Sequence, residues 1–104
     1  MENKKVRIPT IFKVAGVSFN KKNVDSLEDN QVLILELDFE NRYDKNAIKI
    51  KTKSDKMIGF VPKEFNEAIE KKFEKISNKY TLKVKNIHKW DGPTGIEVEF
   101  TKGS

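Results

Sequence analysis

The sequence contains no cysteine and only one histidine and one tryptophan. The lack of cysteine excludes disulfides, thiolate-based structural zinc sites, thiol nucleophiles and iron–sulfur clusters. No apolar run approaches the roughly 18–20 residues of a membrane span, and the first nine residues lack the apolar stretch of a signal peptide. We therefore expect a protein of the cytoplasm that does not enter a membrane, and we predict no cofactor.

Charge, by contrast, is abundant. The 104 residues include 21 Lys and Arg against 16 Asp and Glu, which gives a net charge of +5. A chain of this length builds one core, and we expect a single domain over 6–101 with flexible tails at 1–5 and 102–104 that acts as a monomer. The basic balance favours a polyanionic partner, although a lysine-rich composition without any binding role would produce the same excess.

Alternation of apolar and polar residues predicts short β-strands along most of the chain. The expected strands cover 8–19, 31–40, 47–52, 57–61, 80–87 and 95–100. We expect the first strand to be buried on both faces, and the second to direct Leu33, Leu35, Leu37 and Phe39 into the core. A glycine inside the fourth strand, Gly59, indicates a bulge or a close backbone approach.

Only one segment has helical periodicity, and it predicts a helix near 63–77. The polar stretch 20–30 is expected to form a long loop or a ragged helical turn, while 41–46, 53–56 and 90–94 are turns by composition. Six short strands and one inserted helix constitute a mainly β fold. Because closure removes exposed strand edges, we expect a small OB-like or SH3-like barrel.

The candidates for catalysis are weak. The single histidine, His88, has no cysteine partner, and no nucleophile stands beside a base in the sequence. Glu36, Asp38 and Glu40 share one strand face and could bind a hard cation. An ordinary solvated strand face has the same pattern, so we predict that the protein is not an enzyme.

Binding of nucleic acid requires cations for phosphates and flat aromatic faces for bases. The cations Arg42, Lys45, Lys49, Lys51 and Lys63 occur close in sequence to Tyr43 and Phe60, with Phe19 at the end of the first expected strand. Phe19 and Phe60 are equally well explained as core residues. Tyr43 lies in a polar turn, where a large aromatic side chain gains little unless it packs inward or meets a ligand.

Four short motifs occur in order along the chain. They are Val-Ala-Gly-Val at 14–17, Leu-Glu-Leu-Asp at 35–38, Asn-Arg-Tyr-Asp-Lys-Asn-Ala-Ile at 41–48 and Ile-Gly-Phe-Val-Pro at 58–62. In this pattern the sequence resembles the HIRAN domain family from about residue 12 to the helix, and more weakly to residue 100. The resemblance implies an OB-like barrel with added helices. It also implies recognition of the 3′ end of single-stranded DNA, because members fused to fork-remodelling translocases have that activity.

The resemblance assigns roles to individual residues. Tyr43 would stack on the terminal base, and Asp44 would accept a hydrogen bond from the 3′-hydroxyl group. Phe19 corresponds to a second aromatic position, and Lys63 to a basic position that contacts phosphate. Alternatively, Asp44 would only stabilise a tight turn and Tyr43 would only cover the mouth of the barrel.

Three positions depart from the pattern of the DNA-binding members. Ser18 stands where they carry arginine, Phe60 where they carry histidine, and Arg42 where the turn has proline. Arg42 could replace the missing cation. We predict a module that binds single-stranded DNA at a free 3′ end in DNA repair or replication-fork processing, beside a helicase or nuclease partner. The alternative is a protein-interaction adaptor that kept the barrel and lost DNA-end binding.

Overall fold

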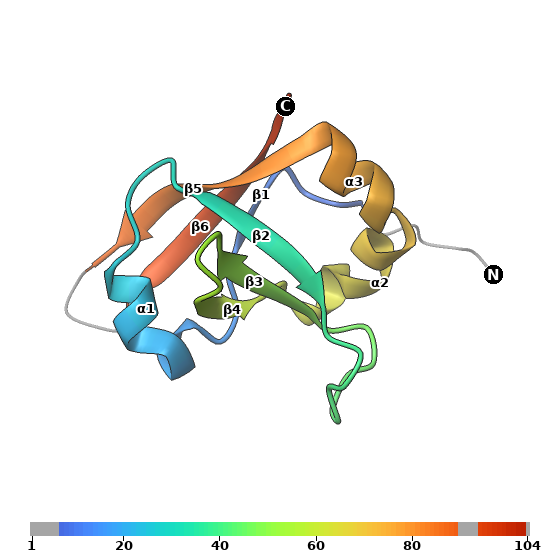
Figure 1. The fold of residues 1–104 in the computed structure, drawn as a ribbon, viewed down its shortest axis with the longest axis horizontal. Coiled ribbons are helices and arrows are strands. Elements are labelled where there is room, and N and C mark those ends of the chain that lie inside the picture. Colours follow the sequence, from blue (N-terminus) through green and yellow to red (C-terminus); the bar gives the residue numbers. More distant parts are fainter. Residues whose placement is uncertain (1–6, 90–93, 104) are drawn as a thin grey trace.

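One six-stranded antiparallel sheet with short helices at its margins makes up the fold (Figure 1). The computed structural model describes residues 7–89 and 94–103. The strands are β1 (Ile11–Lys13), β2 (Val32–Leu37), β3 (Ile48–Thr52), β4 (Met57–Phe60), β5 (Tyr80–His88) and β6 (Gly95–Lys102), in the spatial order β1-β6-β5-β2-β3-β4. The helices are η1 (Val17–Asn20), α1 (Lys21–Asp25), α2 (Lys63–Lys71) and α3 (Phe73–Lys79). The predicted mainly β fold is confirmed.

The alternation that predicted the strands produces the core directly. In β3, Ile48 and Ile50 are completely buried while Lys49 and Lys51 face outward. The same inward phase recurs in the other long strands and in the helices that cover the sheet. The largest fully buried side chains are Ile48, Ile50, Ile58, Ile69, Ile96, Val24, Val84 and Val98.

The second predicted strand is shorter than expected, and Phe39 is not a core residue. Leu33 is buried and Leu35 and Leu37 are partly buried, but β2 ends at Leu37 and Phe39 is 74% exposed. The chain turns immediately after the strand, since the Asp38 carbonyl accepts a hydrogen bond from the Asn41 amide at 3.2 Å. Alternation therefore continued in the sequence beyond the last residue that pairs in the sheet.

The first predicted strand is largely wrong. Only Ile11–Lys13 form β1, and only one face is buried, because Phe12 is 5% exposed whereas Ile11 is 41% exposed. Gly16 adopts a left-handed conformation with φ of 72° and redirects the chain into η1. Residues 17–20 are consequently helical, and the polar stretch that follows contains α1, a helical turn as predicted, with Val24 buried.

The two opposite edges of the sheet are joined at one point. Ala15, just after β1, exchanges two backbone hydrogen bonds of 2.8 Å with Phe60 in β4, the opposite edge strand. Gly59 makes this approach possible, because a Cβ atom there would clash with the Ala15 carbonyl oxygen and lie 2.6 Å from Val14 Cγ1. The β3–β4 register also shifts at this point, so the bulge and the close approach predicted at Gly59 both occur.

The single predicted helix is two helices. The backbone leaves helical geometry at Lys72, with φ of −116° and ψ of 21°, which separates α2 from α3. Each segment then buries its own inward residue, Ile69 in α2 and Ile76 in α3. The helical spacing of apolar residues continues across the break, so the sequence predicted one helix. In addition, α3 ends at Lys79, two residues past the predicted end at 77.

The C-terminal strand extends beyond the expected domain boundary at residue 101. β6 includes Lys102, and the Gly103 amide donates a hydrogen bond of 3.1 Å to the Lys79 carbonyl. The predicted turn at 90–94 lies outside the described residues except for Thr94. Among the helices described, none is long and apolar enough to cross a membrane.

Candidate nucleic-acid interface

The turn between β2 and β3 is organised by the side chain of Asn41. Its Oδ1 accepts hydrogen bonds from the backbone amides of Tyr43 and Asp44 at 2.8 and 2.9 Å, and its Nδ2 donates to Asp38 Oδ2 at 3.2 Å. This is the local chemistry for which asparagine is selected in turns. The predicted turn at 41–46 is therefore correct, and its backbone is held in one arrangement.

Asp44 closes the same turn and attaches it to α2. Its Oδ1 accepts from the Asn46 amide at 2.9 Å, and its Oδ2 accepts from the Asn66 amide nitrogen Nδ2 at 2.8 Å. The hydrogen bond from the Asn46 backbone, followed by that from Asn66, lowers the pKa of Asp44, and the nearby charge of Lys63 acts in the same direction. Asp44 thus remains a charged acceptor at neutral pH.

Asn66 was missed in the sequence, although it decides where the turn sits. It is only 4% exposed, and its Oδ1 is buried without a hydrogen-bond partner in the described part of the chain. The signal was a polar residue three positions before the buried Ile69 on the inward face of a helix. A buried asparagine at such a position usually serves a specific partner, and here the partner is Asp44.

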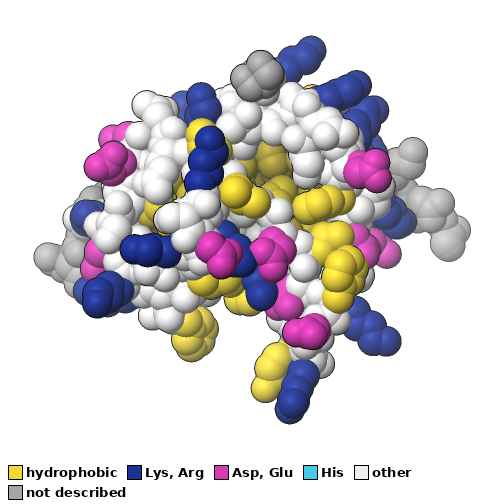
Figure 2. Space-filling view, viewed as in Figure 1, with side chains coloured by type: hydrophobic (Ala, Val, Ile, Leu, Met, Phe, Trp, Pro, Cys, Tyr) yellow, Lys and Arg dark blue, Asp and Glu magenta, His cyan; other side chains and the backbone are white. Residues whose placement is uncertain are grey.

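Tyr43 and Arg42 project from the tip of the turn. Tyr43 is 95% exposed and Arg42 is exposed as well, with no ion pair to any described residue. Figure 2 shows hydrophobic and basic side chains protruding on the side of the molecule where Figure 1 places the β2–β3 connection. Tyr43 therefore does not act as a hydrophobic lid over the described part of the chain, because its side chain is almost fully exposed.

Phe19 and Phe60 both lie close to Gly16. A Cβ atom on Gly16 would lie 3.7 Å from Phe60 Cδ2 and 3.8 Å from Phe19 Cδ2, so both ring edges flank this glycine. Phe19 is 88% exposed and Phe60 is partly buried. Ser18, also exposed, precedes Phe19 in η1. Phe19 is thus not a core residue, and it extends from a 3₁₀ turn rather than from a strand.

Several of the predicted residues are neighbours at the β4 edge of the sheet. Phe60 ends β4, and Lys63 begins α2 three residues later, close enough to Asp44 to affect its pKa. Lys49 lies opposite Phe60 in the β3–β4 ladder. We call this edge of the sheet, with Phe19, Lys49, Phe60 and Lys63, the β4 edge strip.

The acidic residues Glu36, Asp38 and Glu40 do not form a metal site in the part of the chain that the structure describes. Glu36 Oε1 lies 2.7 Å from Lys51 Nζ, and Asp38 Oδ1 lies 3.9 Å from Lys49 Nζ. No group of three potential ligands among His, Cys, Asp and Glu comes together in residues 7–89 and 94–103. The carboxylates of Glu36 and Asp38 instead pair with lysines of the neighbouring strand β3, and Glu40 lies beyond the end of β2.

The HIRAN domain family model matches residues 10–100, which is most of the chain. The chain belongs to the HIRAN domain family. HIRAN domains are nucleic-acid-binding domains, so membership supports DNA binding in general. No curated protein matches the chain.

Two solved structures share the HIRAN fold seen here. The crystal structure of the HIRAN domain of human HLTF has a TM-score of 0.64 and 22% identity, covering 86% of this chain and 72% of that one. A protein from Lactobacillus plantarum has a TM-score of 0.66 and 16% identity, covering 88% of this chain and 89% of that one. At these identities the two likenesses establish the fold.

The lowered pKa of Asp44 leads us to predict that the folding stability of this HIRAN domain decreases in acid. Because its pKa is lower in the folded chain than the ordinary value of 3.8, its contribution to stability is present above that value and is lost as the pH falls through the lowered pKa. Asp44→Asn removes the titrating group. We expect thermal melting of the variant to depend less steeply on pH than that of the parent as the pH falls below the ordinary value and through the lowered pKa of Asp44.

Asp29→Asn is the matched control, since Asp29 is exposed and its side chain makes no hydrogen bond or ion pair with the described residues. This variant should follow the parent curve. Parallel curves for Asp44→Asn and the parent would show that the bonds from Asn46 and Asn66 do not depend on the charge of Asp44.

Proposed function

We propose that this HIRAN domain binds single-stranded DNA, with preference for a free 3′ end, along the β4 edge strip and the turn at 41–46. The observation that carries the proposal is the 95% exposure of Tyr43 on a turn whose backbone is fixed by Asn41 and Asp44. A large aromatic ring held in water by a rigid support is arranged to stack on a base. In this proposal the ring of Tyr43 stacks on the terminal base, and the ring of Phe19 stacks on a second base.

Asp44 has the properties required to read a terminal hydroxyl group. Each of its oxygens accepts one hydrogen bond, from Asn46 and Asn66, but a carboxylate has about four acceptor positions. Its lowered pKa keeps it ionised, so it accepts a hydrogen bond from a hydroxyl and repels a terminal phosphate. The structural role and the proposed end-reading role of Asp44 are therefore compatible.

The basic residues of the same edge supply contacts for phosphates. Lys63 lies beside Asp44, and Arg42 is exposed next to Tyr43. Ser18 provides no charge beside Phe19, and Phe60 offers a ring edge where DNA-binding relatives carry histidine. We assign to Arg42 the phosphate contact that an arginine at position 18 would make. The DNA strand would then be held on the side of the β4 edge strip nearest the turn at 41–46.

The proposed role is binding without catalysis. The domain would act as a monomer in DNA repair or replication-fork processing and deliver a DNA end to a helicase or nuclease partner. A net charge of +5 supports association with a polyanion, and each phosphate contact adds a salt-dependent contribution to the affinity.

Fluorescence anisotropy with single-stranded oligonucleotides tests the proposal. We expect tighter binding to an oligonucleotide that ends in a 3′-hydroxyl than to the same sequence ending in a 3′-phosphate, and an affinity that falls as salt rises. A duplex with blunt ends serves as the control for general charge. Weak, salt-insensitive binding that is equal for both ends would overturn the proposal.

A protein-interaction adaptor is the second candidate, and one observation favours it. Phe19 is 88% exposed beside the uncharged Ser18, an arrangement that suits a hydrophobic contact with protein as well as a base. An adaptor would retain its partner after nuclease treatment, and Phe19→Ala would release it. Loss of the partner on nuclease treatment would instead support the DNA-binding role.

A further inference from the structure

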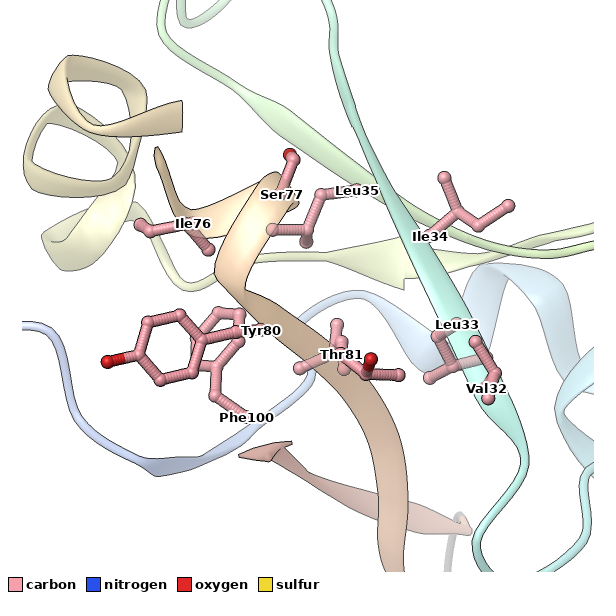
Figure 3. A pocket seen from close by; sticks show the side chains of 10 residues that line it. Val32, Leu33, Ile34, Leu35, Ile76, Ser77, Tyr80, Thr81 and Phe100 are labelled. Atoms are coloured by element: carbon pink, nitrogen blue, oxygen red, sulfur yellow. The ribbon is translucent and has the colours of Figure 1, made fainter. Parts of the chain in front are cut away.

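A second surface, separate from the turn at 41–46, surrounds the start of β5. A cleft of about 380 Å³ lies between the segment 8–10, α3 and the end of β6, with Tyr80 and Phe100 in its lining. A neighbouring cleft of about 200 Å³, seen in Figure 3, continues from the same two residues and Ile76 toward β2. In Figure 1, α3 and the first part of β5 lie at the upper right, whereas the β2–β3 turn lies at the bottom of the view, beyond α2.

The floor of the larger cleft is apolar and fixed. The Tyr80 ring packs edge-on against Phe100 with a centroid distance of 6.4 Å, and Phe100 packs against the buried Phe12 at 5.9 Å. Ile76 is 8% exposed, while Tyr80 remains 41% exposed. These contacts anchor the exposed ring to the core, so the cleft is formed before any ligand arrives.

The rim of the cleft carries positive charge only. Lys72, Lys75 and Lys102 line it together with Ile8, Pro9 and Thr10, and no acidic side chain is part of the lining. None of the three lysines makes an ion pair or a side-chain hydrogen bond with another described residue. Figure 2 shows basic side chains along the margin of the molecule near α3.

We propose that this cleft is a docking site for an acidic peptide segment that carries a large apolar side chain. The apolar side chain inserts against Ile76, Tyr80 and Phe100, and the acidic residues pair with the lysines of the rim. An apolar anchor surrounded by complementary charges is the usual arrangement of a small protein-recognition site. The site is independent of DNA binding and would attach the domain to a protein partner.

A peptide fits this cleft better than a nucleic-acid strand does. Single-stranded DNA needs ring faces on which bases can stack. Here the two rings are turned at 71° to each other in an edge-on contact, and aliphatic side chains complete the walls. No amide or carboxylate side chain lines the cleft to read the edge of a base.

NMR titration of the ¹⁵N-labelled chain tests the proposal with a defined probe. The probe is a seven-residue peptide with two central phenylalanines between aspartates and glutamates, blocked at both ends. We expect saturable shift changes in the amides of Thr10, Lys75–Tyr80 and Phe100–Lys102. Two control peptides, one with serine in place of the acidic residues and one with glycine in place of phenylalanine, should each bind about fivefold more weakly or worse.

Charge reversal on the chain provides the matched comparison. Lys75→Glu should weaken binding of the acidic peptide about fivefold or more, whereas Lys71→Glu, an equal charge change outside the lining, should have a much smaller effect. Tyr43→Ala should leave peptide binding unchanged, which separates this proposal from DNA binding. Absence of saturable shifts, shifts centred elsewhere, or displacement of the peptide by oligothymidylate bound at the same amides would each overturn it.

Discussion

Replacement of Tyr43 by alanine is expected to weaken binding of single-stranded DNA roughly tenfold or more, because a base stacked on an aromatic ring contributes about 1–3 kcal/mol. Thermal stability should stay within about 0.5 kcal/mol of the parent, since a side chain that is 95% exposed contributes little packing. Anisotropy titration together with a thermal melt of the same preparation measures both quantities.

Two further variants show whether the ring itself is responsible. Tyr43→Phe keeps the flat face and should retain most of the affinity. Phe39→Ala removes another exposed aromatic ring of the same β2–β3 connection, 74% exposed, and should have a smaller effect. Equal losses from Phe39→Ala and Tyr43→Ala, or no loss from either, would contradict the assigned stacking position.

The largest loss of stability is expected from Gly59→Ala. The added methyl group would clash with the Ala15 carbonyl oxygen and lie 2.6 Å from Val14 Cγ1, and neither backbone nor a buried valine can move aside easily. Overpacking of this kind costs about 3 kcal/mol, which corresponds to a decrease in Tm on the order of 10–20 °C. Calorimetry or circular dichroism would measure it.

Gly95→Ala is the matched control for that substitution. A methyl group at Gly95 would lie 3.3 Å from Lys13 Cε, the far end of a flexible side chain that can shift. Its Tm should change by much less than that of Gly59→Ala. If Gly59→Ala melts at the parent temperature, the contact between Ala15 and Phe60 opens at little cost, and the two edges of the sheet are not firmly joined.

Local patterns predicted much of this fold because the relevant forces are local. The strict alternation around Ile48 and Ile50 has only one inward phase, and the structure buries that phase completely. The stretch 8–19 is apolar on both phases, so its sequence could not distinguish a doubly buried strand from a short strand followed by a helical turn. The left-handed backbone of Gly16 decides between the two structures. The sequence could not show this, because glycine also occurs inside strands.

The candidate site was predictable to a similar degree. The turn chemistry of Asn41 and Asp44 is local, and the hydrogen bonds agree with it. The bond from Asn66 to Asp44 joins residues far apart in sequence and depends on how α2 is placed against the turn. The exposure of Phe19 could likewise not be predicted from the sequence, because an apolar residue beside a strand is usually in the core.

The pairing of β1 with β6 has a consequence for how this chain reaches its native state. Ile11 lies opposite Glu99, so β1 has no partner strand until β6 is in place, and the bridge from Ala15 to Phe60 adds a second distant contact. Contacts between such distant parts of a chain carry a high entropic cost of loop closure and form late. During synthesis on a ribosome, β1 would therefore remain unpaired until nearly the whole domain had emerged, and the β2–β3–β4 meander would be the part able to assemble first.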